Sequence, residues 1–365
     1  MEKRCTIADV ARAAGVSKQT VSRVLNNKGE LSAATRERIL AVIKELGFQP
    51  NAAARSLLTG RTSTVGLVVP DVNNPFFVDI AKGVHDAARE KGYHVLLYDT
   101  CDSPDLEAQS IRLLSERRAD GLIICSSRLS DGRLASLLKG VGPVVLVNRW
   151  VKGLDVTQIG ADYVKGAALA TNHLIESGHR KIAAVTLTVE TPNSRAKLEG
   201  YSKAMDEAGL GVHADLIAYA QSSLQGGVNA GNDLLGRAQR PTAIVAYSDP
   251  VGIGAMHACR HWGVSVPENM AVIGFGGNEI AGVVNPPLST VFIPNFEMGH
   301  RAVELLLERV ADRSIPAVVE ETEAHLIIRA STMIGAEPLD DHRLQHTFLS
   351  VPSPSDGRWL PQTRH

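Results

Sequence analysis

The chain has 365 residues, which allows two or three domains at about 150 residues each. Hydrophobic residues at 44% and charged residues at 21% are ordinary for globular proteins and exclude a disordered or fibrous chain. No apolar run approaches the ~20 residues of a membrane helix, and no signal-peptide core follows the charged opening Met1–Arg4. We therefore expect a cytoplasmic protein without a membrane partner.

Charge is divided unevenly along the chain. Residues 1–60 hold ten Lys and Arg against five Asp and Glu, whereas the remainder is acidic. The basic end is suited to a polyanion. Aromatic residues are nearly absent from it, which argues against stacking on single-stranded nucleic acid and favours a reader of duplex DNA.

Three short helices are predicted within the basic end. Thr6 begins the first helix, and Gly15 ends it. Ser17 caps a second helix over 18–25, and a third helix runs over 33–46. Two helices joined by a tight turn and closed by a third are typical of a helix-turn-helix unit.

The second helix has a polar outward face made of Lys18, Gln19, Ser22 and Arg23. In a major groove, Gln19 could bond adenine or Arg23 could bond guanine. Ser17, Thr20 and Asn26 could bond phosphates. The alternative is a plain three-helix packing unit with a solvated face. The basic excess, the turn and the caps together favour DNA recognition.

An Ala-rich segment follows at residues 50–61. A helix of about eight residues without a packed face is too short to be stable alone in water. The segment is either a linker between domains or a hinge helix that forms in a DNA minor groove with Leu57 as an apolar wedge. Both descriptions can hold in different states.

From residue 64 onward, short apolar runs alternate with helical stretches, which predicts parallel βαβ units in two halves. The predicted strands are residues 65–69, 95–98, 121–125, 144–147, 182–186, 243–247 and 272–275. The predicted helices are residues 77–91, 106–117, 163–176, 197–208 and 251–262. Ligands of such sheets bind beyond the carboxyl ends of the strands.

Enzyme patterns are weak in this sequence. Gly252–Gly254 lacks the third glycine of a dinucleotide loop, and Ser126–Ser127 lacks a nucleophile elbow. His257, Cys259 and His261 share one predicted helix, but a zinc site needs further ligands, so we expect surface histidines and a buried thiol. We predict no catalytic residue, no metal and no cofactor.

Residues that follow the predicted strands are candidates for binding a small molecule. The Phe76 ring could lie against a sugar or a base. Asn148 and Arg149 either direct donors into a cleft or form a solvated strand end. Asp249 either accepts hydrogen bonds from ligand hydroxyls or caps the helix that follows it.

A series of motifs extends from Thr6 to Thr332. The matching segments are residues 6–11, 16–17, 20–26, 50–51, 54–55, 57, 66–71, 74–77, 120–123, 178–179, 273–275, 329 and 331–332. The series resembles the LacI/GalR (lactose-repressor/galactose-repressor) family of bacterial transcription regulators. This resemblance implies an α/β protein with an N-terminal all-α helix-turn-helix domain and a bilobed domain, like that of periplasmic binding proteins, with two parallel doubly wound sheets.

The resemblance also implies site residues and partners. It gives base reading to Lys18, Gln19 and Arg23, backbone contacts to Ser17, Thr20, Asn26 and Asn51, and minor-groove entry to Ala54 and Leu57. Thr6, Ser22 and Arg55 complete the expected DNA-binding set. The expected partners are double-stranded operator DNA in the bacterial nucleoid, a second copy of the chain and a small carbohydrate-like effector.

Two departures from the family pattern fall in the expected effector pocket. Lys197 stands where the family usually has a ligand-gripping Arg, and Gly276 stands where it usually has an Asp. A missing carboxylate makes the pocket more positive and favours a small anionic effector, which is either a sugar acid such as gluconate or a phosphorylated sugar. The segment 274–280 with Lys197 also resembles the gluconate-repressor branch. Against this, Glu279 could restore a carboxylate, and Lys197 could simply pair with Glu199.

We therefore expect four parts. They are a helix-turn-helix domain at 1–49, a hinge helix or linker at 50–61, a bilobed effector-binding and dimerisation domain at 62–332, and a flexible tail at 333–365 without Leu heptads. The predicted function is repression of a carbohydrate-utilisation operon under effector control. A sugar-binding transport component and an α/β enzyme are the alternatives, and the missing signal peptide and missing nucleophile argue against them.

Overall fold

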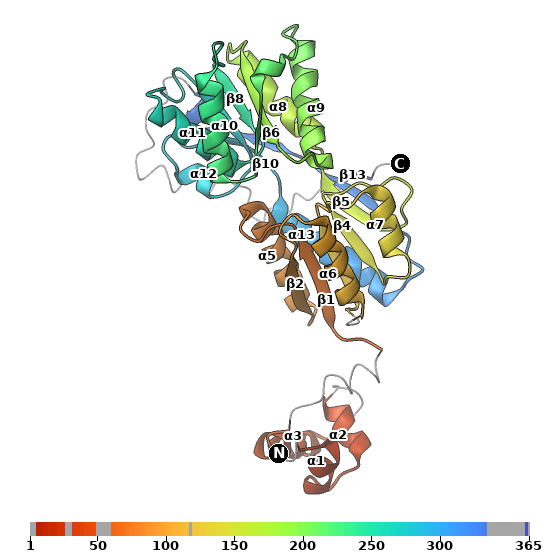
Figure 1. The fold of residues 1–365 in the computed structure, drawn as a ribbon. Helices are drawn as coiled ribbons and strands as arrows, with labels where there is room; N and C mark the ends of the chain where they lie inside the picture. The colour runs from red at the N-terminus through yellow and green to blue at the C-terminus, as the bar shows by residue number, and fades with distance from the viewer. Residues whose placement is uncertain (1–4, 26–30, 49–59, 117–118, 334–361, 364–365) are drawn as a thin grey trace. The chain divides into compact units, whose positions relative to one another are not determined.

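The computed structural model describes residues 5–25, 31–48, 60–116, 119–333 and 362–363 (Figure 1). The chain divides into two compact units, Met1–Thr62 and Ser63–His365. Across the described ranges, no helix is both long and apolar enough to cross a membrane.

The first unit is built from three helices around one small core. The helices are α1 (Ile7–Ala13), α2 (Lys18–Leu25) and α3 (Ala33–Glu45). Val10, Val21 and Ile39, one from each helix, are fully buried. Burial of such a side chain contributes about 1.5–3 kcal/mol. The three predicted helices are confirmed, and the left-handed Gly15 (φ 64°) makes the tight turn between the first two.

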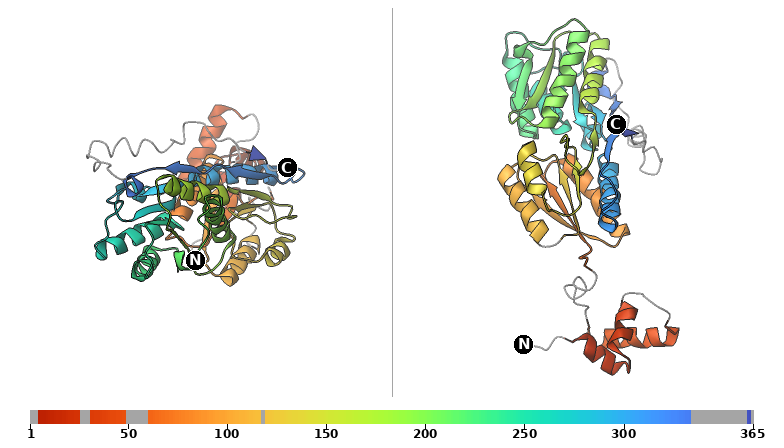
Figure 2. Two further views of the ribbon diagram at one scale, coloured as in Figure 1. Left: turned by 90° about the horizontal axis from the view of Figure 1, so that it is seen from above. Right: turned by 90° about the vertical axis from the view of Figure 1, so that its right-hand side faces the viewer.

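The second unit contains two open sheets, each with helices on both faces (Figure 1, Figure 2). The strands of the first sheet are β1 (Thr64–Val69), β2 (His94–Asp99), β3 (Gly121–Cys125), β4 (Val144–Val147), β5 (Thr157–Ala161), β11 (Val319–Thr322) and β13 (Gln362–Thr363). Its helices are α5 (Pro75–Glu90), α6 (Pro104–Glu116), α7 (Asp131–Leu138) and α13 (Asn295–Ala311). We call this group of elements lobe 1.

Lobe 2 holds the other sheet. Its strands are β6 (Ile182–Leu187), β7 (Ile217–Ala220), β8 (Ala243–Ala246), β9 (Ala271–Gly276), β10 (Ser289–Phe292) and β12 (His325–Ile327). Its helices are α8 (Tyr163–Glu176), α9 (Pro192–Glu207), α10 (Leu224–Gly236), α11 (Asp249–His261) and α12 (Ile280–Val283), and 3-10 turns lie at Ala214–Leu216 and Ala330–Thr332.

The strand orders are β13-β11-β5-β4-β3-β1-β2 in lobe 1 and β12-β10-β9-β8-β6-β7 in lobe 2. All neighbours pair in parallel except β13 with β11 and β12 with β10. Two mostly parallel sheets confirm the predicted fold class. Parallel strands bury both faces: along β1, Leu67 packs in the core beneath α5 and α13, and Val68 packs in the core beneath α6 and α7.

Between β1 and β12 the chain passes between the lobes three times, and β13 lies in lobe 1 again. The chain leaves lobe 1 between β5 and α8, returns between β10 and α13, and crosses once more between β11 and β12. Parallel strands of both sheets therefore direct their carboxyl ends toward one shared cleft.

The seven predicted strands are all present, with ends shifted by one residue at most. The prediction did not include β5, β7, β10, β11 and β12. These strands are short or polar, as in the sequence Thr-Gln-Ile-Gly-Ala of β5. Strand β5 is buried between its neighbours in the sheet, whereas β12 is partly exposed. Part of the segment expected to be a tail, Gln362–Thr363, pairs with β11 as strand β13.

Candidate functional site

The candidate DNA-reading surface is the outer face of α2. Lys18, Gln19 and Arg23 are exposed, while Val21 and Val24 on the opposite side are buried. A recognition helix needs its long donor side chains in solvent and its apolar side held by the other helices. Both conditions are met, so α2 offers an ammonium, an amide and a guanidinium on one exposed surface.

Smaller polar groups lie around the start of α1 and α2. Ser17 Oγ accepts the Thr20 backbone N–H at 3.1 Å and lies 2.8 Å from the Thr20 hydroxyl, which caps α2 as predicted. The exposed Thr6 donates its N–H and hydroxyl to Asp9, and Ser22 is partly buried. Five predicted DNA contacts lie outside the described residues: Asn26, Asn51, Ala54, Arg55 and Leu57.

The candidate effector site is a cleft between the lobes at the carboxyl ends of their strands. Its atom-free space is about 590 Å³, counting its mouth. Lobe 1 lines it with Asp71, Asn74, Phe76, Phe77, Asp102, Ser126 and Arg128. Lobe 2 lines it with Tyr163, Asn193, Lys197, Ser222, Tyr247, Ser248, Phe275 and Asn278. The mixture of aromatic and polar side chains suits a small polar ligand.

Lys197 is the cation of lobe 2 in this cleft. Its ammonium lies 3.9 Å from the centre of the Phe275 ring, 4.1 Å from that of Tyr247 and 5.1 Å from that of Tyr163. Nζ also donates to the Tyr247 carbonyl at 2.8 Å. The residue as a whole is partly exposed. The surrounding groups nevertheless exclude water from the ammonium, which lowers the pKa of Lys197 to about 7. The negative charge of Asp249 has the smaller, opposite effect and raises this pKa.

Phe76 also lines the cleft, where its ring meets Phe77 edge to face at 5.1 Å between ring centres. Phe77 belongs to the core and to the cleft, because its side chain is buried in the lobe 1 core and also reaches the lining of the cleft.

Asp249 and Gly276 lie outside the cleft lining. The fully buried Asp249 carboxylate accepts from the Thr290 hydroxyl at 2.5 Å and from the Asn278 N–H at 2.7 Å, which ties α11 to the end of β9. Burial raises the pKa of Asp249, and these hydrogen bonds lower it. Gly276 has φ 132°, and a Cβ there would lie 3.4 Å from Asp249 Oδ2. The backbone therefore gives a conformational reason for glycine at this position.

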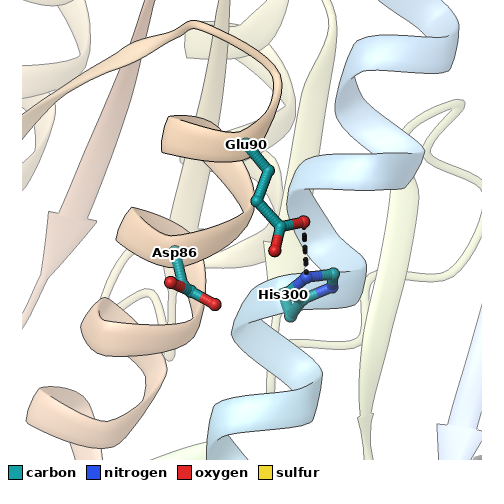
Figure 3. Close-up of side chains that lie close together, drawn as sticks. All are labelled: Asp86, Glu90 and His300. Carbon is teal, nitrogen blue, oxygen red and sulfur yellow. Dashed lines mark ion pairs between the residues drawn. The ribbon is translucent and has the colours of Figure 1, made fainter.

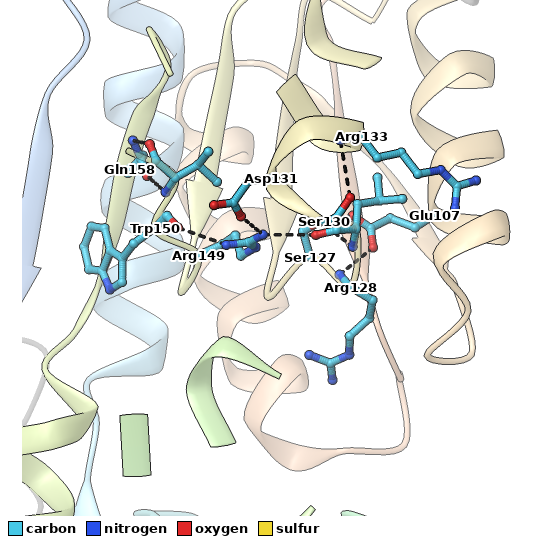
Figure 4. A network of polar contacts seen from close by, with 11 residues as sticks. Glu107, Ser127, Arg128, Ser130, Asp131, Arg133, Arg149, Trp150 and Gln158 are labelled. Atoms are coloured by element: carbon cyan, nitrogen blue, oxygen red, sulfur yellow. Dashed lines mark hydrogen bonds and ion pairs between the residues drawn. The ribbon is translucent and has the colours of Figure 1, made fainter. Parts of the chain in front are cut away.

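Asn148 and Arg149 likewise turn away from the cleft lining. Asn148 is fully buried with φ 54°, and its Oδ1 accepts the Ala161 N–H at 3.3 Å. The buried Arg149 guanidinium donates to the Leu129 carbonyl at 3.0 Å and to Asp131 at 2.5 Å (Figure 4). Through these contacts Arg149 fixes the loop between β3 and α7.

Cleft residues that the sequence reasoning missed include Asp102, Ser126 and Arg128. Arg128 Nε donates to Asp102 Oδ1 at 2.9 Å, and Nη1 donates to the Ser126 carbonyl at 2.9 Å. Each of the three follows a predicted strand end, which is the signal that could have found them.

Several polar groups of lobe 2 end at the cleft without a protein partner. Among the described residues, buried side-chain atoms without a hydrogen bond include Tyr163 OH, Ser222 Oγ, Ser248 Oγ and Asn278 Nδ2, and all four residues line the cleft. A buried polar group without a partner costs about 1–3 kcal/mol. A ligand rich in hydroxyl groups would satisfy them.

One group of potential metal ligands comes together in the described part of the chain, formed by Asp86 and Glu90 of α5 and His300 of α13 (Figure 3). His300 lies between Glu90 and Glu304 at 3.7 Å from each, and Asp86 pairs with Arg89 at 2.5 Å. These contacts make the group an ion-pair network between two helices.

The three potential zinc ligands of α11 do not all face one another, as a zinc site would require. His257 and His261 are exposed, whereas Cys259 is fully buried in the lobe 2 core. The two histidines face solvent, and the thiol faces the opposite way.

A second hollow lies between α6 and α7, on the outer side of lobe 1. Exposed Arg112, Arg133 and Lys139 contribute to its lining. None of the buried, unpartnered polar atoms found among the described residues belongs to it. The cleft between the lobes is therefore the better candidate for a specific ligand.

Two family models match the chain. "Periplasmic binding proteins and sugar binding domain of LacI family" matches residues 62–333, and "Bacterial regulatory proteins, lacI family" matches residues 6–51. The HTH-type transcriptional regulator GalR of Escherichia coli (strain K12) is 36% identical over 326 residues, which are 89% of this chain and 95% of GalR.

Solved structures of transcriptional regulators are also similar to this chain. The chain is 33% identical to the transcriptional regulator CelR in its cellobiose complex, with a TM-score of 0.68 over 90% of this chain and 100% of that one. The lac repressor dimer bound to operator and the anti-inducer ONPF has a TM-score of 0.83 at 24% identity, over 91% of this chain and 100% of that one. At 24% identity, the similarity to the lac repressor shows the fold alone.

Proposed function

Because the chain belongs to the LacI family of bacterial regulatory proteins, we propose that it represses a carbohydrate-utilisation operon and that a small sugar acid such as gluconate controls it. Its class is that of DNA-binding transcriptional regulators and not of enzymes. Binding to an operator, control by an effector and dimerisation are all parts of this proposal.

The DNA part of the proposal rests on α2 and on the expected parts of the chain. Two copies of the unit at 1–49, joined through the bilobed domain at 62–332, would read two half-sites of a near-palindrome. The segment 50–61 would act as the hinge, and Leu57→Ala is expected to weaken operator binding more than random-duplex binding.

The observation that carries the effector part is the cleft itself. It combines aromatic rings, on which a sugar can lie, with the four unpartnered polar groups of lobe 2. The two lining carboxylates are already engaged, since Asp71 accepts from the Asn73 N–H at 2.9 Å and Asp102 pairs with Arg128. Since Asp102 offsets the charge of Arg128, it is the charge of Lys197 that supports a sugar acid over a neutral sugar.

The test has two steps. Genomic fragments retained by the purified full-length protein would be sequenced, and the operator so found would be titrated against a random duplex of equal length. Gluconate, D-glucose and D-ribose would then be titrated calorimetrically and added to the operator complex. We expect gluconate to bind most tightly and to change operator affinity. Tighter binding of a neutral sugar would reject the acid, and equal affinity for both duplexes would reject the regulator.

A further inference from the structure

Backbone strain gathers at the carboxyl ends of the lobe 1 strands. Of the described residues other than glycine, five have a left-handed φ, and four of these follow strands β2, β3 and β4: Cys101 at 49°, Asp102 at 56°, Ser126 at 44° and Asn148 at 54°. Such residues cost about 1–3 kcal/mol each and persist where the surroundings fix them. Two of them, Asp102 and Ser126, are the residues that hold Arg128.

Arg128 is the cation that lobe 1 presents to the cleft, and its side chain is 14% exposed. Nε donates to Asp102 Oδ1 at 2.9 Å, Nη2 lies 2.8 Å from the same oxygen, and Nη1 donates to the Ser126 carbonyl at 2.9 Å. A guanidinium carries five N–H donors. These contacts use at most three, so both terminal nitrogens keep a donor for a further acceptor.

A buried carboxylate fixes the loop that carries Arg128 (Figure 4). Glu107 of α6 is 3% exposed, and it accepts the Ser127 hydroxyl and, at 2.7 Å, the Arg128 backbone N–H. Burial raises the pKa of Glu107, and the hydrogen bonds from Ser127 and Arg128 lower it. The cost of burying this group is offset only because the loop is held in one conformation.

Arg128, Lys197 and Tyr247 all line the cleft. The Tyr247 ring is 4.1 Å from Lys197 Nζ. Burial raises the pKa of Tyr247, and the positive charge of Arg128, acting from the other lobe, lowers it. Arg128 of lobe 1 and Lys197 of lobe 2 are thus both available to a ligand in this cleft.

We propose that Arg128 is a second anion-binding residue of the cleft, and that Arg128 and Lys197 hold one carboxylate or phosphate group of the effector from opposite lobes. This inference rests on the proposed function and adds the residue that selects the anion. It also gives a physical reason why the effector would change the arrangement of the two lobes. An anion between two cations on different lobes stabilises the arrangement in which the lobes are close, and only a ligand with such differential contacts shifts that equilibrium.

The experiment compares full-length variants by calorimetric titration with gluconate, D-glucose and inorganic phosphate. Arg128→Gln removes the charge, and a double variant with Asp102→Asn removes the carboxylate that would lose its partner. Arg133→Gln is the matched control, because Arg133 pairs with Asp105 on the same lobe outside the lining of the cleft. Thermal unfolding of each variant shows that it is folded.

We expect both Arg128 variants to bind gluconate and phosphate at least ~10-fold more weakly, with glucose changed less than ~3-fold, since hydrogen bonds to charged groups contribute about 1.5–3 kcal/mol. Arg133→Gln should change none of the three. Unchanged gluconate and phosphate binding in the double variant, or an equal loss for glucose, would overturn the anion role of Arg128. Failure of the parent protein to bind either gluconate or phosphate would also overturn this role. Phosphate binding without any sugar binding would instead keep the anion site and reject the proposed function.

Discussion

The enclosure of Lys197 by three aromatic rings makes its charge depend on pH near neutrality. Burial lowers the pKa of Lys197 to about 7, compared with about 10.4 for an exposed lysine. Below the lowered value the ammonium is charged, and above it the neutral amine predominates. Attraction for an anion should therefore be present at pH 6 and lost as the pH rises through about 7 to 8.

This gives the first prediction. Gluconate affinity of the full-length protein should fall as the pH rises from 6 to 8.5, while glucose affinity changes little. Lys197→Met should bind gluconate weakly at every pH, with a flat profile. Calorimetric titration in buffers of matched ionic strength measures both. A gluconate affinity that rises with pH, or a profile that persists in Lys197→Met, would contradict the role given to this ammonium.

Arg23 provides the second prediction. Arg23→Ala should weaken operator binding by about 1–3 kcal/mol and relax the preference at one base pair, because a guanidinium can bond both acceptors of guanine. Arg12→Ala is the control of equal charge, since Arg12 is exposed on α1 and pairs with Asp9. Titration of operators with single base substitutions measures the effect. An equal and uniform loss in both variants would mean that Arg23 acts only through its charge.

The sequence could predict which loops form the cleft but not the direction of each side chain. Phe76 and Lys197 line it as expected. Asn148 and Asp249 also follow strands as expected, yet a left-handed backbone at Asn148 and two hydrogen bonds at Asp249 turn them into the protein. Position after a strand fixes the place of a backbone, whereas the rotation of a side chain depends on neighbours distant in sequence.

Helix pairs in both lobes pack through glycine. A Cβ at Gly83 of α5 would lie 2.0 Å from the Phe296 carbonyl oxygen of α13, and one at Gly299 would lie 2.2 Å from that of Ile80. The same closeness appears in lobe 2, where a Cβ at Gly254 of α11 would lie 2.1 Å from the Leu224 carbonyl oxygen of α10. These backbones approach too closely for any side chain.

The third prediction follows from this packing. Gly83→Ala should lower the free energy of unfolding by about 1–3 kcal/mol, because an added methyl group forces two helix backbones apart. Gly132→Ala is the matched control, since Gly132 lies in α7 with nothing within 4 Å of its Cβ position. It should stabilise the protein by about 0.5–1 kcal/mol through helix propensity. Urea unfolding distinguishes the two, and equal effects would refute the packing argument.

Elements with a strong apolar pattern could be predicted closely, and elements without one could not. The strands Gly121–Cys125 and Val144–Val147 lie where the sequence places them, because continuous apolar runs are typical of buried parallel strands. The strand Val319–Thr322, of sequence Val-Glu-Glu-Thr, carries no such pattern. It is a strand because β5 pairs with it, and Glu320 within it accepts hydrogen bonds from Arg301 of α13.

For the whole molecule, a direct contact joins the lobes beside the cleft. Asn193 of α9 donates from Nδ2 to Ser126 Oγ of lobe 1 at 3.4 Å. A ligand that occupies the cleft can therefore change how the lobes approach each other, and a hinge segment would transmit the change to the DNA-reading units.

The fourth prediction concerns the assembled regulator. The protein should be a dimer at micromolar concentration, and the logarithm of its operator affinity should fall linearly and steeply with the logarithm of salt concentration, because phosphate contacts release counterions. Random duplex should bind more weakly at physiological salt. Analytical ultracentrifugation and salt titrations provide the measurements. A monomer, or an affinity independent of salt, would contradict dimeric groove binding.

The crossovers between the lobes also affect how the protein is made on the ribosome. Lobe 1 begins with β1 but lacks α13 and β11 until residues 295–322 have been synthesised. Until then the apolar surfaces of Ile80 and Val84, which share a core with Val303 and Leu306 of α13, lack this cover. Domains otherwise tend to fold in order of synthesis. A nascent chain that stalls within lobe 2 would thus expose lobe 1 as well, and would present an unfinished core to chaperones and proteases.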